Sequence, residues 1–192
     1  MKIIATLAIV TSIFLSGCAH QIELNPKTDA FTESTNKSDA VVGYHISDEL
    51  RNKKVTSPGG GGDKVTYTPY KDTETVLFQV LSNKFKDVYL VKSLDDKSFV
   101  ADNGIQFIFV PTLSTESSSS SFLTWPPTTF IVTINAKAVD ADGNAVWEEQ
   151  VVGTGLAEFD EFKSDFSLSA RRATEAAFLA LAEKIDNANV FK

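Results

Sequence analysis

The chain has few of the side chains on which many enzymes depend. Its 192 residues include one cysteine and two histidines. A protein metal site usually combines several such ligands, so we expect neither a metal nor a cofactor. Serines are abundant, but no Gly-x-Ser-x-Gly motif occurs, and His45 follows Tyr44 inside an expected strand. The sequence therefore favours a non-enzymatic protein.

Positive charge is also scarce. There are 18 Lys and Arg residues against 25 Asp and Glu, which gives a net charge of -7 and an isoelectric point near 4.8. Such a surface repels phosphate backbones, so nucleic acid is not an expected partner. The apolar fraction of 43% is enough for one domain with a core of its own.

One long apolar run stands at the N-terminus. Lys2 is followed by an apolar stretch from Ile3 to Leu15. This stretch is shorter than the roughly 20 residues that span a bilayer. A positive charge followed by a short apolar run is typical of a secretory signal peptide. The run ends in the sequence Leu15-Ser16-Gly17-Cys18.

These four residues resemble the lipobox of bacterial lipoproteins. The resemblance implies cleavage between Gly17 and Cys18 and attachment of a diacylglycerol to the Cys18 sulfur. The lipid would then be the contact with the membrane. Ala19 stands where an aspartate would favour retention in the inner membrane, so the resemblance implies the outer membrane, with the body on the periplasmic face.

We expect three segments along the chain. Residues 1–17 form the signal peptide. Residues 18–40 are mostly polar, which predicts a flexible tether that holds the body about 25 Å from the membrane. Residues 41–192 form the α+β domain.

The expected fold class of the domain is α+β. Apolar alternation predicts strands, and apolar residues on one face at helical spacing predict two long helices. The expected strands are 41–46, 65–68, 87–92, 105–110, 129–138 and 145–158, and the helices cover 73–85 and the region after 165–167, with a short helix or turn at 95–102. Together they indicate a single domain with a mixed sheet and two helices packed on one face, ending in a β-hairpin and then a helix.

Two motifs suggest ligand sites but favour turns on inspection. Gly59–Gly62 would suit a phosphate, but the lysine and hydroxyl residue of a P-loop are replaced by Asp63-Lys64-Val65, and a strand follows. Asp140–Asn144 begins like a calcium loop, but Val151 stands where the bidentate glutamate is needed. We therefore predict a turn at each position.

The best prediction of a contact surface is the serine-rich loop 117–127. Its aromatic and proline residues would form a rigid apolar projection for a partner. The alternative is that Trp125 folds back onto the sheet. The residues concerned are Phe122, Trp125, Pro126 and Pro127, with Gly60 and Gly61 as a weaker second surface.

Residues 56–72, 122–127 and 158–166 together resemble a group of uncharacterised proteobacterial lipoproteins, which brings no established activity. We expect a non-enzymatic accessory component of an envelope complex, engaged in assembly or transport, with an envelope protein as partner. One alternative is a small hydrolase that uses carboxylates near Asp160, and another is a passive structural or surface lipoprotein. Carboxylates gathered in a pocket would favour the hydrolase, and an uncovered sheet edge beside an exposed Trp125 would favour the binding protein.

Overall fold

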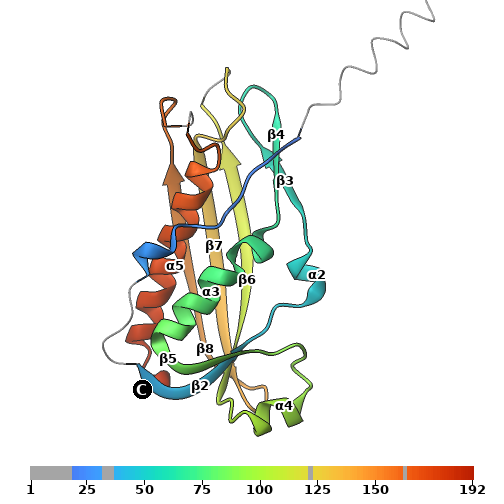
Figure 1. Cartoon of the computed structure of the whole chain (residues 1–192), viewed down its shortest axis with the longest axis vertical. Helices are drawn as coiled ribbons and strands as arrows, with labels where there is room; N and C mark the ends of the chain where they lie inside the picture. Colours follow the sequence, from blue (N-terminus) through green and yellow to red (C-terminus); the bar gives the residue numbers. More distant parts are fainter. Residues whose placement is uncertain (1–18, 32–36, 121–122, 162–163) are drawn as a thin grey trace, which may run out of the picture.

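The computed structural model describes residues 19–31, 37–120, 123–161 and 164–192. Figure 1 shows an elongated molecule in which long strands run parallel to the long axis and two helices lie across one face. The elements are β1 (Ala19–Gln21), β2 (Ser38–Tyr44), α2 (Asp48–Arg51), β3 (Val55–Pro58), β4 (Lys64–Tyr67), α3 (Pro69–Lys84), β5 (Phe85–Leu90), α4 (Lys97–Asp102), β6 (Phe107–Ser118), β7 (Thr129–Asp140), β8 (Ala145–Leu156) and α5 (Leu168–Asn187), with 3-10 helices at Thr28–Ala30 and Asn189–Phe191.

The main sheet has five strands in the order β5-β2-β6-β7-β8. β2 pairs in parallel with β5 and β6, whereas β6, β7 and β8 form an antiparallel meander. Along β7, Phe130, Val132 and Ile134 are buried while the residues between them are not, as the alternation predicts. The α+β class, the mixed sheet with two helices on one face and the closing hairpin and helix are all confirmed.

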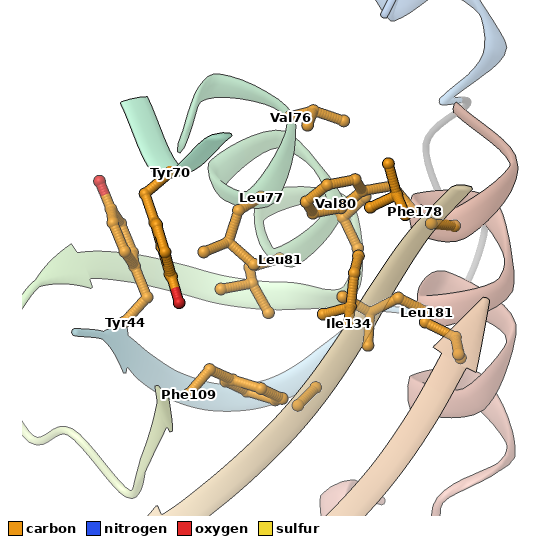
Figure 2. Close-up of a cluster of buried hydrophobic side chains, with 14 of the residues drawn as sticks. Tyr44, Tyr70, Val76, Leu77, Val80, Leu81, Phe109, Ile134, Phe178 and Leu181 are labelled. Atoms are coloured by element: carbon orange, nitrogen blue, oxygen red, sulfur yellow. The ribbon is translucent and has the colours of Figure 1, made fainter. Parts of the chain in front are cut away.

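The core lies between this sheet and the two long helices. Figure 2 shows side chains of α3 (Leu77, Val80, Leu81) and of α5 (Phe178, Leu181) meeting Ile134 and Phe109 of the sheet. All of these side chains are buried. α3 begins at Pro69 rather than near Thr73, because proline suits the first helical position and the Asp72 carboxylate accepts hydrogen bonds from the N–H and hydroxyl of Thr68.

A second, smaller sheet has the order β1-β4-β3. β3 and β4 form a hairpin around residues 59–63, and β1 adds to β4 in parallel, with Ala19 opposite Lys64. This overturns the prediction of a flexible tether for residues 19–31. Ile22, Leu24 and Phe31 are buried, and the few apolar side chains in this polar stretch are enough to hold it against α3 and α5.

The serine-rich region is also more regular than expected. β6 continues to Ser118 and stays in register with β7, so that Ser118 lies opposite Thr129. The outer face of this part of the sheet is solvent-exposed, and serine and threonine are compatible with an exposed strand face. The loop is thereby shortened to residues 119–128.

Among the helices of the described residues, none has the length and apolar content needed to cross a membrane.

Candidate functional site

Three loops and the first strand meet at one end of the molecule, which we call the loop end. The loops are β3–β4 (59–63), β6–β7 (119–128) and β8–α5 (157–167), and Figure 1 shows them together at the end where β1 joins the fold. The sequence treats the Gly59–Gly62 turn and the Trp125 loop as two separate features. The structure brings them into direct contact.

The contact between the first two loops is made by backbone atoms. The N–H of Gly60 donates to the carbonyl oxygen of Trp125 at 2.7 Å. A Cβ atom on Gly60 would lie 1.8 Å from the carbonyl oxygen of Thr124, and one on Gly59 would lie 2.3 Å from that of Trp125. The glycines are therefore required for close approach of two loops, which supports the prediction of a turn.

Trp125 lies between two aromatic rings. Its indole stacks on His20 with 4.2 Å between ring centroids, and it meets Phe166 at 4.9 Å. His20 Nε2 in turn lies 3.2 Å from a carboxylate oxygen of Asp63. Trp125 thus joins β1, the β3–β4 turn and the β8–α5 loop.

This arrangement corrects the prediction of an apolar projection. Trp125 is half-buried and both Pro126 and Pro127 are buried, since the loop folds back onto the core through its aromatic contacts. Gly60 is buried as well, and Gly61 is exposed with a positive φ. Gly17, Cys18 and Phe122 lie outside the described residues.

The exposed apolar side chains of the loop end are different ones. Leu123 is 95% exposed, Phe159 61%, Leu156 60% and Phe166 51%. Leu156 and Phe159 border a shallow hollow of about 230 Å³ whose other wall is the β6–β7 loop. Leu123 and Leu156 were not among the contact residues predicted from the sequence, although an apolar residue in a loop and one at a strand end were visible signals.

Two carboxylates of the β8–α5 loop, Glu161 and Asp165, are engaged in structural pairs. Glu161 receives two hydrogen bonds from the guanidinium of Arg172, which together with the N–H of Glu158 lowers its pKa from the ordinary 4.5 to about 2. Asp165 lies 3.5 Å from a guanidinium nitrogen of Arg171 and accepts from the N–H of Ser167. A carboxylate with so low a pKa cannot serve as a general acid near neutral pH, so Glu161 does not support the hydrolase alternative.

His45 has a structural position. Its Nδ1 lies 2.8 Å from the carbonyl oxygen of Val91, at the end of β5. Asp140 closes the β7–β8 turn by accepting hydrogen bonds from the N–H groups of Asp142 and Asn144. Both agree with the structural roles expected from the sequence.

The β8 edge of the main sheet is a second candidate surface for binding a partner. β8 has 12 residues and β7 as its only neighbour among the described strands. Ala157 N–H donates to Thr128 O beside this ladder. Because bonded and non-bonded pairs alternate in antiparallel strands, Gln150, Val152 and Thr154 direct their N–H and C=O groups away from β7. Leu156 O points outward too and accepts from Arg172.

A larger hollow of about 860 Å³ lies at the opposite end, beside the C-terminus. Its charged rim combines Lys84 and Asp186, which are paired with each other. Because the rim carries charges of both signs, it does not indicate whether a ligand of this hollow would be an anion or a cation.

No protein-family model matches the sequence, and none of the curated proteins searched matches it. Solved structures similar to this chain include a Xanthomonas campestris protein of the DUF330 family, with 10% identity over 89% of this chain and 98% of that chain and a TM-score of 0.40. The PelC dodecamer of Paraburkholderia phytofirmans has 12% identity over 76% and 94% and a TM-score of 0.41. A candidate lipoprotein of Caulobacter crescentus has 12% identity over 74% and 86% and a TM-score of 0.38. At such values these similarities carry no inference about function.

Proposed function

We propose that the protein is a lipid-anchored, non-enzymatic accessory protein of the bacterial envelope that binds a partner protein along β8. The lipid on Cys18 holds it in the outer membrane, on the periplasmic face. The partner contributes an extended segment that pairs with the edge of the main sheet.

The anchor rests on the Leu15-Ser16-Gly17-Cys18 pattern. The structure is compatible with it in one respect. β1 begins at Ala19, so cleavage before Cys18 would remove nothing from the described fold.

The binding role rests on a single observation, the open edge of β8. A long edge strand presents unpaired backbone groups that favour addition of another strand, and monomeric proteins usually cover, shorten or charge such edges. From Gln150 to Leu156, β8 carries no charged side chain.

A proline substitution tests the edge. Val152→Pro removes an N–H that points away from β7, so it should abolish strand addition while leaving the β7–β8 ladder in place. Val152→Thr is the matched control, because it keeps the N–H and a β-branched side chain. A photo-reactive amino acid at position 150, in cells, reports the partner.

The expected result is an adduct that is present with Val152→Thr and lost with Val152→Pro. An adduct that persists with proline, or no adduct in any variant, would contradict binding at this edge. Circular dichroism of both variants checks that the fold is intact.

The anchor is tested separately. Incorporation of a labelled fatty acid should occur in the wild-type chain and be absent from Cys18→Ala, and the wild type should fractionate with the outer membrane. Ala19→Asp should move the lipidated protein to the inner membrane. Ala19 is exposed, so this substitution should not disturb β1.

A further inference from the structure

We infer that the loop end lies directly on the lipid bilayer, with Leu123 and Phe159 inserted at its surface. The inference rests on the proposed anchor at Cys18 and adds to it the face of the domain that meets the membrane.

The distance between the proposed anchor and the body is short. Cys18 is covalently joined to Ala19, and successive Cα atoms lie about 3.8 Å apart. Ala19 is fixed opposite Lys64 by strand pairing. His20 is held by its stacking on Trp125 and its contact with Asp63. The acyl chains therefore begin beside the loop end.

An apolar surface surrounds this point. Leu123, Phe159 and Phe166 of the loop end, and Leu156 at the adjoining end of β8, are all at least half exposed. Phe166 contacts Trp125, which contacts His20, so a continuous row of aromatic rings leads from β1 to this surface. Exposed apolar side chains grouped at one place mark an interaction surface, and leucine and phenylalanine are typical of residues that enter the bilayer interface.

Tryptophan fluorescence tests the inference, because the two tryptophans lie at opposite ends. Trp125 belongs to the loop end, whereas Trp147 lies nine residues from Leu156 along β8, or about 30 Å. Trp147→Phe leaves Trp125 as the reporter, and Trp125→Phe leaves Trp147. Each full chain is produced in bacteria, purified with its lipid and placed in phosphatidylcholine vesicles that carry a nitroxide on the headgroup.

We expect the nitroxide to quench most of the Trp125 emission and to leave the Trp147 emission. Adding Leu123→Ser and Phe159→Ser should weaken the quenching of Trp125, because the anchor alone would hold the loop end near the bilayer without inserting it. Phe78→Ser, which removes a half-exposed phenyl group of α3 that packs beside Tyr44, outside the loop end, is the matched control and should change nothing.

Equal quenching of both tryptophans, or an unquenched Trp125 in a lipid-anchored chain, would overturn the inference. A protein adduct from a photo-reactive residue at position 123 in cells would also overturn it. Mass spectrometry of the same samples reports the lipid on Cys18 independently. If the lipid is absent, the proposed anchor fails, and Cys18, the only cysteine, is coupled to a maleimide phospholipid so that the orientation is still measured.

Discussion

At the scale of single residues, the loop end depends on a backbone contact that only glycine permits. Gly60→Ala would place a methyl group on the carbonyl oxygen of Thr124. We expect a lower melting temperature and an altered emission of Trp125 in the Trp147→Phe background. Gly62→Ala is the control, because Gly62 has a positive φ but nothing within 4 Å of its Cβ position. It should cost about 1 kcal/mol of strain and leave the Trp125 emission unchanged.

Tyr44 gives a prediction about alkaline pH. Burial, together with the Glu74 carboxylate that accepts its hydroxyl hydrogen bond, raises the pKa of Tyr44 from 10.0 to about 12. A pKa that is higher in the folded state adds stability that is complete below pH 10.0 and is lost as the pH rises toward about 12. Glu74→Gln should lower the pKa of Tyr44 only in part, since burial is the larger cause. Ultraviolet absorbance titration measures the pKa of Tyr44, and Tyr44→Phe assigns the signal. The same pKa in the wild type and in Glu74→Gln would contradict the role of Glu74.

At the scale of elements, the sequence was most informative where apolar residues repeat regularly. The alternation in β7, the apolar face of α5 and the Asp142-Gly143 turn all predict the observed elements. These features depend on local periodicity, which a sequence displays directly.

Other elements depend on partners that are distant in sequence. β1 exists because β4 offers an edge and because Ile22 and Leu24 find a place beside the helices. The exposed half of β6 has no apolar alternation that would distinguish it from a loop, and its pairing with β7 defines it as a strand. The meeting of the Gly59–Gly62 turn with the Trp125 loop is likewise tertiary. The candidate site was therefore predicted as parts and not as an assembly.

The packing of α5 on β8 gives a prediction at this scale. A Cβ atom on Gly153 would lie 2.1 Å from the carbonyl oxygen of Ala173 and 2.4 Å from the backbone nitrogen of Ala177. Gly153 thus allows the helix to approach closely, opposite buried alanines. Gly153→Ala should push α5 from the sheet and lower the free energy of unfolding by about 1–3 kcal/mol or more, measured by urea unfolding. Thr154→Ala, at an exposed neighbouring position, should have little effect.

At the scale of the whole molecule, residues 19–31 are part of the body. Leu24 is fully buried, so Leu24→Ala should lower the free energy of unfolding by about 2–5 kcal/mol. In a flexible tether the same substitution would cost nothing. Glu23→Ala is the control, because its ion pair with Arg171 lies at the surface and such pairs contribute at most about 1 kcal/mol. Equal free energies of unfolding of the two variants in denaturant titrations would contradict this and would support a flexible tether.

The direct pairing of Ala19 with β4 also limits how the domain can be oriented on a membrane. A domain on a flexible tether varies in its distance from the membrane and in its tilt, whereas a domain anchored next to its first strand keeps a fixed orientation. The β7–β8 hairpin is about 40 Å long at 3.3 Å per residue, and its turn lies at the end of the molecule opposite the loop end (Figure 1), where the proposed anchor would attach. The open edge of β8 would then lie roughly along the membrane normal. A segment bound to it would extend from the membrane surface toward the opposite end of the molecule.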